Sequence, residues 1–367
     1  MQLSVIILNY NVRYFLELCL HSVSKSVEDL DAEIIVVDNA SPDGSCEMVK
    51  RLFPDIILIQ NSENLGFAKA NNQAAKIAKG EWVCILNPDT VVGEDCFKNI
   101  LKYSNSIKNL GILGCRLMDG SGNFLPESKR NIPTTKISFQ KLRGNSDLYY
   151  ANHIKENSIA EVDILVGAFM LLKKSLYEKV GGFDEDFFMY AEDVDLCYRV
   201  LNAGYKNIYY GEESVIHFKG ESTIKDSKYL KNFYGSMQVF YKKHFRKNVV
   251  YDIAVWFGIR LVPIFKKHKD LEKIKTKSAV LVSNLRLKNL QENLEVPLTQ
   301  LETISSLAND STYIFNVESI PFKSILKCIN KGASLKNSNF RFYMPRSNFI
   351  IGSDNSNDRG QILFLKD

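Results

Sequence analysis

The amino-acid sequence predicts an α/β protein whose mostly parallel sheet is flanked by helices. Three observations support this class. Short apolar runs of strand length recur through the first hundred residues, segments with helical spacing separate them, and polar clusters follow the runs. Buried parallel strands have nearly continuous apolar sequences, and the helices between them cover both faces of the sheet. In such sheets, ligands bind at the carboxyl ends of the strands.

The expected elements alternate regularly up to residue 86. Each apolar run has the length of a buried strand, and each intervening segment carries apolar residues at intervals of three and four. The expected strands are Ser4–Leu8, Glu33–Val37, Ile56–Gln60 and Trp82–Leu86. The expected helices between them are Val12–Ser24, Ser45–Phe53 and Gly66–Lys79.

The rest of the chain is less regular. Residues 116–161 are rich in Gly, Asn, Pro and Lys and are expected to form long loops with short strands. Regular structure is expected again in the later segments, which are Val162–Lys173, Phe183–Gly204, two short strands within 205–218 around residues 211–213, and an amphipathic helix at Tyr229–His244.

Three parts are expected along the chain. Residues 1–245 form the main α/β domain, residues 246–275 a basic and amphipathic helical segment, and residues 276–367 a small α/β appendage. Residues 271–294, rich in Lys and Leu, are expected to be helical in part. Short apolar strands are expected in the appendage at Thr312–Phe315, Phe340–Tyr343 and Asn348–Ile351.

The composition excludes several classes of function. Of the 367 residues, 45% are hydrophobic and 24% charged, and the net charge of +5 is too small to indicate a nucleic-acid partner. The seven cysteines form no CxxC pair, so buried reduced thiols are expected rather than a zinc site or a disulfide framework. Neither GxxxxGK(S/T) nor GxGxxG occurs, which excludes P-loop hydrolases and dinucleotide oxidoreductases.

We expect a cytoplasmic protein without a membrane span. No basic segment precedes the first apolar run, and no stretch reaches about 18 uninterrupted apolar residues. Basic clusters at 242–247 and 266–269 flank the apolar run 249–265, a pattern that suits peripheral association with the anionic inner face of the plasma membrane. A core helix that packs on the main domain is an equally good explanation.

Six ordered motifs resemble those of family 2 glycosyltransferases, and their wording is closest to the rhamnosyltransferase-like branch. They are residues 5–11 (VIILNYN), 36–45 (VVDNASPDGS), 64–72 (NLGFAKANN), 86–90 (LNPDT), 167–170 (GAFM) and 182–196 (GFDEDFFMYAEDVDL). The resemblance covers roughly residues 1–244. It implies a GT-A fold, a nucleotide-diphosphate sugar donor and inversion at the anomeric carbon.

The donor-binding candidates follow the first three strands. A carboxylate at Asp38 can accept the ring N–H of uracil or thymine, while Asn39 and Ser41 approach the ribose; an Asx turn or a helix N-cap is the alternative explanation. Gly66 permits close approach of the backbone at a helix N-terminus, although a plain helix start has a similar sequence. The other donor-binding candidates of these loops are Asn9, Asn11, Asn64 and Asn72.

Asn87-Pro88-Asp89 occupies the place of the family's D-x-D motif, with Asn in place of the first Asp. A divalent cation, Mg²⁺ or Mn²⁺, is expected because the reaction must neutralise a departing diphosphate. Asp89 is the expected charged ligand, with a Pro-Asp turn after a strand as the alternative. The resemblance implies that His217 completes the metal shell, with a structural histidine as the alternative. Asn87 is expected at the ribose or a metal-bound water. Lys219 is expected at the diphosphate, with a solvated lysine as the alternative.

Glu192, Asp193 and Asp195 open a predicted helix. Inverting transfer needs a base for the acceptor hydroxyl, and the family's base corresponds to Asp193. Glu192 and Asp195 are expected on the acceptor side, where mutual repulsion can raise the pKa of one carboxyl group. Stabilisation of the helix N-terminus is the simpler explanation for the same three acids.

The expected function is inverting transfer of a sugar from dTDP-L-rhamnose or a UDP-sugar to a saccharide acceptor, in bacterial surface polysaccharide synthesis. The acceptors of this branch are often lipid-linked, so a lipid-linked saccharide is expected here. The alternative is a catalytically degenerate, sugar-nucleotide-binding scaffold in a polysaccharide assembly complex, which Asn87 alone supports. The appendage lacks acidic or His clusters and is therefore expected to serve docking or acceptor selection.

Overall fold

The computed structural model describes the chain except for residues 143, 222–226, 246–273, 286–289 and 366–367. Nearly all of the helical segment predicted at 246–275 therefore lies outside the described residues. This part includes the apolar run 249–265 and the basic cluster 266–269. Within the described part, two sheets with flanking helices confirm the α/β class.

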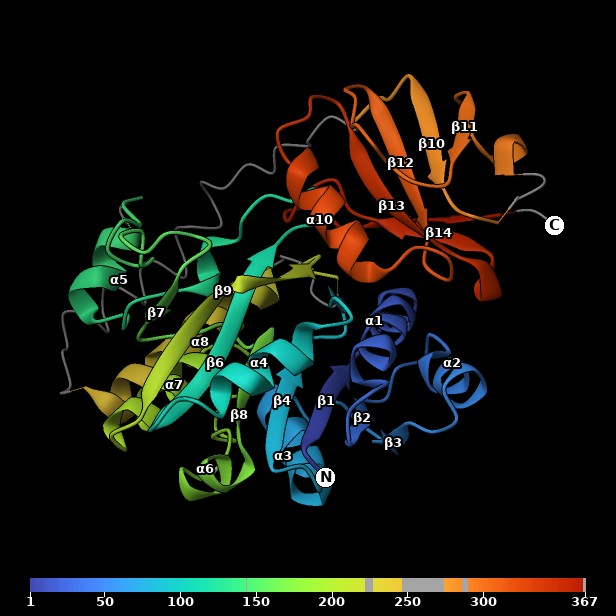
Figure 1. The fold of residues 1–367 in the computed structure, drawn as a ribbon. Coiled ribbons are helices and arrows are strands. Elements are labelled where there is room, and N and C mark those ends of the chain that lie inside the picture. The colour runs from blue at the N-terminus through green and yellow to red at the C-terminus, as the bar shows by residue number, and fades with distance from the viewer. Residues whose placement is uncertain (143, 222–226, 246–273, 286–289, 366–367) are drawn as a thin grey trace.

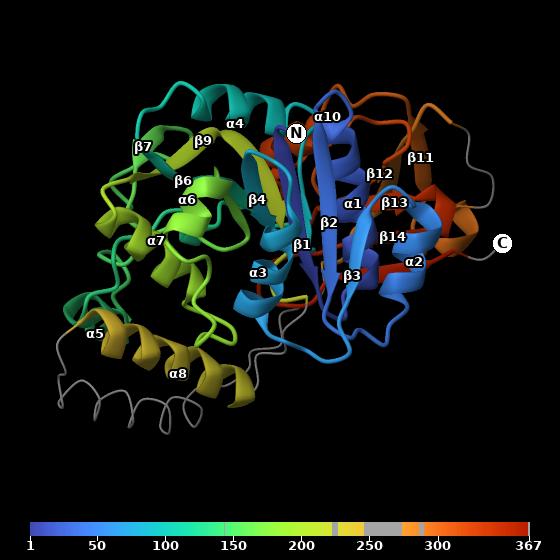
Figure 2. The same ribbon diagram turned by 90° about the horizontal axis from the view of Figure 1, so that it is seen from below.

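The first sheet begins with the strands and helices that the sequence predicts. Strands β1 to β4 run parallel in the spatial order β3-β2-β1-β4. Helices α1, α2 and α4 pack on one face of the sheet, whereas α3, α6, α7 and α8 pack on the other (Figure 2). The first elements are β1 Leu3–Asn9, α1 Arg13–Val27, β2 Ala32–Asp38, α2 Ser45–Leu52, β3 Ile57–Gln60, α3 Phe67–Ile77 and β4 Trp82–Leu86.

The sheet continues beyond β4 in the order β8-β6-β9-β5, with β7 pairing on β9. Strand β8 is antiparallel to β4, and β9 is parallel to β6, so the C-terminal ends of β4, β6 and β9 share one edge. The further elements are β5 Thr90–Val91, α4 Cys96–Ser104, β6 Leu110–Met118, η1 Pro126–Ser128, α5 Thr135–Leu142, β7 Ile159–Glu161, β8 Phe169–Lys173, α6 Lys174–Lys179, α7 Glu192–Asn202, β9 Lys206–His217 and α8 Ser227–His244.

Strand β9 corrects one prediction. Residues 206–217 form one continuous strand instead of two, because β6 runs alongside for its whole length. The register shifts where Cys115 faces Tyr210 and Arg116 faces Ser214, so residues 211–213 form a bulge within the strand. A bulge inserts extra residues without ending the pairing.

The appendage has its own sheet, in the order β11-β10-β12-β13-β14-β15, with α10 alongside (Figure 1). Residues 278–282 form a parallel strand of this sheet, so the helix expected within 271–294 is wrong there. The three short strands predicted near the C-terminus are confirmed. The elements are β10 Ser278–Val282, η2 Leu290–Asn293, β11 Leu298–Leu301, β12 Ser311–Asn316, α10 Phe322–Gly332, β13 Asn339–Met344, η3 Pro345–Ser347, β14 Phe349–Gly352 and β15 Gln361–Phe364.

The appendage and the first sheet share one hydrophobic core. The ring of Phe218, just after β9, contacts Phe15 of α1 at a centroid distance of 4.8 Å and Phe342 of β13 at 6.1 Å. Two backbone N–H groups at the start of α10 donate to Glu94, between β5 and α4. The appendage is therefore packed firmly on the main domain. Its shared core includes Val12, Phe15, Leu18, Val91, Ile216, Phe218, Phe315, Phe322, Phe342 and Phe349.

All seven cysteines are free thiols, as the sequence predicts, and six of them are buried. Burial raises the pKa of the Cys19 thiol to about 12. No helix in the described part of the chain combines the length and the apolar character that crossing a membrane requires.

Replacing Phe342 with alanine tests the shared core. Phe342 is fully buried, and the variant should lower the free energy of unfolding by about 3–5 kcal/mol, because deletion of a buried phenylalanine leaves a cavity. Urea unfolding of the full chain measures this loss. Leu285 is 51% exposed, so Leu285→Ala is the matched control and should change the stability by well under half as much. Equal effects of the two variants would contradict a shared core.

Candidate active site

The polar loops that the sequence predicts gather at one edge of the first sheet. The backbone at this edge is unusual. Nine non-glycine residues among those described have positive φ, and five of them lie in these loops: Asn11, Ala40, Tyr190, Ala191 and Lys219. Left-handed backbone is costly for most non-glycine residues and persists mainly where the surrounding structure enforces it, often at functional sites. The edge is thus the candidate active site.

The ends of β1 and β2 are joined by side-chain hydrogen bonds around Asp38. Asn9 donates from Nδ2 to Oδ2 of Asp38 at 2.7 Å, and the backbone N–H of Ser41 donates to Oδ1 at 2.8 Å. The Ser41 hydroxyl in turn accepts the backbone N–H of Asn11 at 3.0 Å. Asp38 therefore makes the Asx turn that was the alternative to base binding. Its carboxylate still has further lone pairs for a ligand.

Three asparagines fix the next loop. Asn39 donates from Nδ2 to Oδ1 of Asn64 at 3.2 Å and to the carbonyl oxygen of Gly66 at 3.2 Å, and it accepts a hydrogen bond from Asn61 at 2.9 Å. Gly66 has φ +81°, and a Cβ there would lie 2.5 Å from the carbonyl oxygen of Phe188. Only glycine fits this position, because another side chain would collide with the backbone of Phe188. Close approach of a donor to Gly66 stays a prediction.

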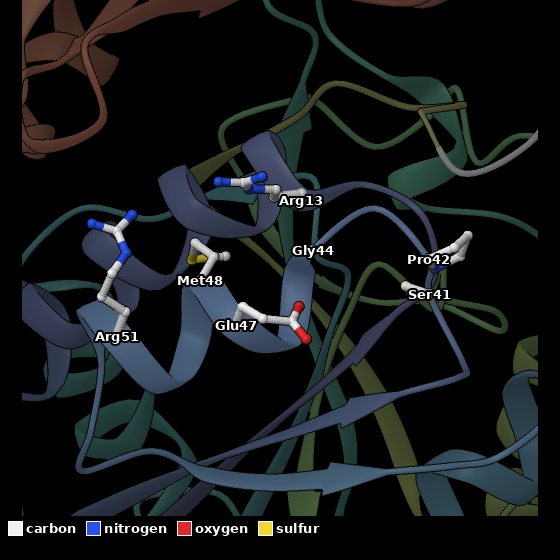
Figure 3. Close-up of a pocket in the computed structure, with 7 residues that line it drawn as sticks. All are labelled: Arg13, Ser41, Pro42, Gly44, Glu47, Met48 and Arg51. Atoms are coloured by element: carbon white, nitrogen blue, oxygen red, sulfur yellow. The ribbon is translucent and has the colours of Figure 1, made fainter.

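A cavity of about 540 Å³ borders the Asp38 turn. Figure 3 shows that Arg13 projects from the start of α1, while Glu47 and Arg51 project from α2 on the other side. Ser41 also lines the cavity. The cavity lies at the β1–β2 end of the site, and its two guanidinium groups and one carboxylate make it polar.

Asp89 and His217 are brought together by backbone pairing. Strand β5 is antiparallel to the end of β9 with Thr90 opposite His217, and the Nε2 atom of His217 lies 3.4 Å from Oδ1 of Asp89. The amide nitrogen of Asn87 lies 3.3 Å from the same Nε2 atom. Both Asp89 and His217 are buried, and Nδ1 of His217 is a buried atom without a hydrogen-bond partner among the described residues.

A carboxylate and an imidazole side by side suit a divalent cation such as Mn²⁺ or Mg²⁺. Within the ranges that the structure describes, no group of three or more His, Cys, Asp or Glu side chains forms a possible metal site. Asp89 and His217 are thus a pair of side chains, fewer than the three that define such a group.

Asp193 lies at the start of α7 and is held by a buried cation. Arg130 donates from Nη2 to Oδ2 of Asp193 at 2.7 Å, and the backbone N–H of Gly167 donates to the same oxygen at 3.1 Å. Burial opposes the charged form of Arg130, but the Asp193 carboxylate and the Tyr149 hydroxyl outweigh it and raise the pKa of Arg130 above its usual range. Gly167 precedes Ala168, whose carbonyl accepts the N–H of Asn87 at 3.0 Å. This short backbone segment therefore connects Asp193 to the Asp89–His217 pair.

Glu192 is the carboxyl group whose pKa is strongly raised. Its side chain is buried, and Oε2 has no hydrogen-bond partner among the described residues. Burial and then the negative charge of Asp193 raise the pKa of Glu192 from 4.5 to about 8. Repulsion within the acidic cluster thus raises one pKa, as the sequence suggested, and the affected group is Glu192.

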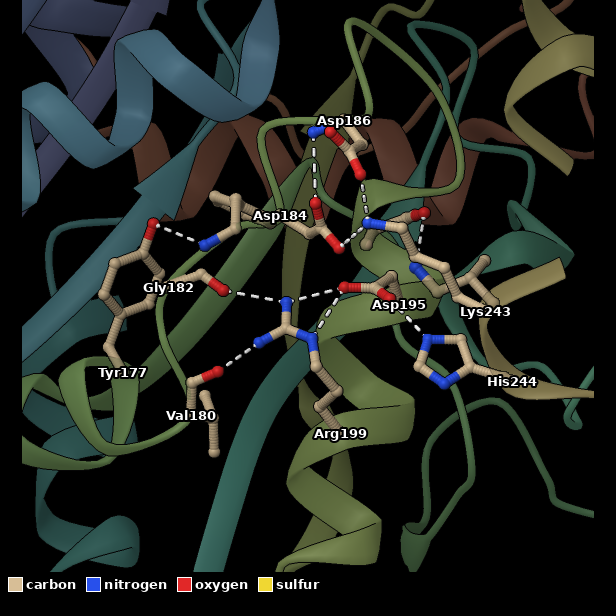
Figure 4. A network of polar contacts seen from close by, with 12 residues as sticks. Tyr177, Val180, Gly182, Asp184, Asp186, Asp195, Arg199, Lys243 and His244 are labelled. Carbon is tan, nitrogen blue, oxygen red and sulfur yellow. Dashed lines mark hydrogen bonds and ion pairs between the residues drawn. The ribbon is translucent and has the colours of Figure 1, made fainter. Parts of the chain in front are cut away.

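The structure does not place Asp195 with Asp193. Asp195 points away into an ion-pair network (Figure 4), where Arg199 binds its Oδ2 at 2.6 Å and Nε2 of His244 lies 2.6 Å from its Oδ1. Arg199 also donates to the carbonyl of Gly182 at 2.8 Å. Asp195 is fully buried. Through His244 it connects α7 to α8, and through Arg199 it connects α7 to the loop that precedes α7. Both carboxylate oxygens of Asp195 thus have structural partners, and its expected acceptor-side role stays a prediction.

Two donor-binding candidates also have structural partners. Oδ1 of Asn72 accepts hydrogen bonds from the Tyr177 hydroxyl at 2.5 Å and from the backbone N–H of Phe183 at 3.0 Å, which ties α3 to the loop after α6. The ammonium group of Lys219 forms an ion pair with Glu127 at 2.5 Å, so it is not simply solvated. The backbone N–H of Lys219 donates to Oδ2 of Asp89 at 3.1 Å.

Several site residues were not singled out from the sequence. Asn61 follows the third strand, and its place in a polar cluster at a strand end was an available signal. Arg130 and Glu127 come from the irregular segment 116–161, where no periodic pattern or motif marks them. Only the tertiary structure brings Arg130 beside Asp193 and Glu127 beside Lys219.

A model of the family described as glycosyl transferase family 2 matches residues 4–181. Among curated proteins, the chain is 28% identical over 241 residues to N-acetylglucosaminyl-diphospho-decaprenol L-rhamnosyltransferase of Mycobacterium tuberculosis, covering 61% of this chain and 78% of that protein. It is 30% identical over 163 residues to rhamnosyltransferase WbbL of Escherichia coli, covering 42% of this chain and 61% of that protein.

Solved structures give a fainter likeness. The mannosyltransferase PcManGT of Pyrobaculum calidifontis, in complex with GDP-Man and Mn²⁺, matches with a TM-score of 0.49 and 23% identity. The match covers 67% of this chain and 65% of that one.

Glu192 gives a prediction about stability and pH. A carboxyl group with a folded pKa of about 8 and an unfolded value of 4.5 stabilises the fold fully below pH 4.5, and this contribution is lost as the pH rises to about 8. Glu192→Gln stays neutral, so its free energy of unfolding should exceed that of the wild type increasingly from pH 5 to pH 8. Chemical unfolding at several pH values measures this difference. A difference that stays constant with pH would contradict the burial of an ionisable Glu192.

Proposed function

Because residues 4–181 belong to glycosyl transferase family 2, we propose that this glycosyltransferase inverts the anomeric carbon of the sugar that it transfers. The donor is a nucleotide-diphosphate sugar, dTDP-L-rhamnose or a UDP-sugar. The acceptor is a saccharide, and the reaction belongs to the synthesis of a bacterial surface polysaccharide. The observation that carries the proposal is the fixed carboxylate of Asp193, one short backbone segment away from the Asp89–His217 pair.

In this proposal, Asp193 accepts the proton of the acceptor hydroxyl while that oxygen attacks the anomeric carbon and the diphosphate leaves. Oδ2 of Asp193 already accepts hydrogen bonds from Arg130 and Gly167, whereas Oδ1 accepts only the adjacent N–H of Val194 at 2.8 Å among the described contacts. Oδ1 is therefore the oxygen proposed to take the proton. Arg130 holds the carboxylate in its orientation, and Glu192 stays protonated beside it near neutral pH.

The proposed cation is held by Asp89 and His217. When bound, a divalent cation neutralises the negative charge that develops on the departing diphosphate. Asn87 contributes no charge, so Asp89 carries more of the attraction for the cation than either acid of a two-Asp motif. Lys219 supports Asp89 through its backbone N–H, and its side-chain charge is shared with Glu127.

The proposed nucleotide site is formed by the loops after β1, β2 and β3. Asp38, with Asn9, Asn11 and Ser41 around it, is proposed to receive the base, and the neighbouring loop with Asn39, Asn64 and Gly66 is proposed to lie along the rest of the donor. The hydrogen bonds among these residues support this assignment, because they hold the loops in one conformation before a ligand arrives.

The acceptor is proposed to be a lipid-linked saccharide, since a decaprenol-linked acceptor appears in the name of the M. tuberculosis relative. Peripheral association with the inner face of the plasma membrane is part of this proposal. Two members of the basic cluster 242–247 form ion pairs within the chain: Lys243 pairs with Asp184 and Asp186, and His244 pairs with Asp195 (Figure 4). Membrane attraction would therefore depend on other basic residues.

Replacing Asp193 tests the catalytic proposal. Asp193→Asn should lower the rate of transfer about 10²–10⁴-fold, because it removes the general base while keeping the shape of the side chain. Binding of the nucleotide should stay within about threefold of the wild type. The measurement is release of nucleoside diphosphate from dTDP-rhamnose and UDP-sugars, together with calorimetric titration of dTDP and UDP. A variant that turns over at the wild-type rate would remove Asp193 from the base role, and a wild-type protein that binds donors but never turns them over would favour the scaffold alternative.

Asp89→Ala tests the cation site. The variant should bind dTDP or UDP about tenfold more weakly in Mn²⁺, because the cation loses its charged protein ligand. In EDTA, the variant and the wild type should bind equally weakly. The cation assignment would be refuted if the variant matched the wild type in both conditions.

A further inference from the structure

The segment from Phe218 to Glu221 connects the proposed donor site to the appendage. It follows His217 directly. The backbone N–H of Phe218 donates to the carbonyl of Asp89 at 3.0 Å, and that of Lys219 donates to its Oδ2 atom at 3.1 Å. The position of Asp89 therefore depends on the position of this segment.

The far end of the segment is fixed by the appendage. Glu221 is only 6% exposed, and its Oε1 atom accepts the backbone N–H of Gly360 at 2.7 Å. Gly360 belongs to the turn between β14 and β15. A Cβ at Gly360 would lie 2.4 Å from the ring of Phe15 and 3.1 Å from the Glu221 carboxylate, so the turn fits closely against both.

Glu221 is a buried carboxyl group whose charged form is disfavoured by its surroundings. Burial raises the pKa of Glu221 to about 7 and Asp89 adds to the rise, while the Gly360 amide and Arg359 oppose it. A second buried carboxyl group close to Asp89 costs free energy unless it is hydrogen-bonded. The hydrogen bond from Gly360 supplies that partner, and the Phe218 ring between Phe15 and Phe342 anchors the same segment by packing.

We propose that Glu221 is a positioning residue through which the appendage sets the arrangement of Asp89 and His217 for donor binding. The appendage thereby takes part in binding the nucleotide-diphosphate end of the donor, in addition to any part in acceptor selection. This inference rests on the proposed function, because it assigns a task to the same donor site.

The chain offers a matched control at another part of the same interface. Glu94 also reaches from the main domain to the appendage, where its two carboxylate oxygens accept the backbone N–H groups of Phe322 at 2.6 Å and Lys323 at 2.8 Å. Glu94→Ala thus removes comparable hydrogen bonds between the same two parts, but it leaves the segment after His217 untouched.

The experiment is calorimetric titration of the full chain with dTDP and UDP in Mn²⁺, with donor KM and kcat from hydrolysis of the corresponding sugar nucleotides. Glu221→Ala should weaken nucleotide binding and raise the donor KM about tenfold, with kcat changed less than about twofold. Glu221→Gln keeps an oxygen that accepts the Gly360 N–H, so it should stay within about threefold of the wild type. Glu94→Ala should bind nucleotide as the wild type does.

The outcomes distinguish the positioning role of Glu221 from the proposed function. If Glu221→Ala binds as tightly as the wild type, or if Glu94→Ala weakens binding equally, the positioning role is overturned. If Glu221→Ala does not fold, Glu221→Asp replaces it, because the shorter side chain loses the same hydrogen bond while keeping the charge, and the same loss is expected. A wild-type protein that binds neither nucleotide in Mn²⁺ would refute the proposed function itself.

Discussion

The pairing of the two-residue strand β5 with the end of β9 is the contact on which both the site and the appendage depend. It sets Thr90 opposite His217, and this register brings Asp89 to His217 from distant parts of the chain. The next pair, Val91 and Ile216, enters the core that the appendage shares. One short ladder of backbone hydrogen bonds therefore orients the two proposed cation ligands and, on its apolar side, supports the second sheet.

A second constraint is electrostatic and concerns the start of α7. Glu192 and Asp193 are adjacent and buried, and both could not be ionised there without compensation. Arg130 provides a positive charge to Asp193 at 2.7 Å, while Glu192 keeps its proton at neutral pH because burial and Asp193 raise its pKa. The two neighbouring acids thus have different surroundings although they share one helix turn, because Arg130 contacts Asp193 and Oε2 of Glu192 has no hydrogen-bond partner among the described residues. This difference is what the proposed base requires.

The shared core also changes how the appendage is understood. Without acidic or histidine clusters, its sequence suggested a module for docking or acceptor selection. Phe342 packs directly against Phe218, and Gly360 donates to Glu221, so the appendage reaches the segment that holds Asp89. Removing the appendage would expose apolar side chains of α1, β5 and β9 to water. The stability of the appendage and the integrity of the proposed donor site are therefore linked.

The sequence by itself determined the α/β alternation, the succession of the first strands and helices along the chain and the positions of the main motifs, because apolar periodicity and strand-end polar clusters are local features. It also indicated that one acid near Asp193 has a raised pKa, but it did not identify that acid as Glu192. Only the tertiary structure decided that Asp195 belongs to Arg199 and His244, that Arg130 holds Asp193, and that residues 278–282 form a strand. These outcomes depend on partners far away in the chain. The spacing and composition of a segment do not specify which distant side chain neutralises the charge of that segment or which distant strand pairs with its backbone.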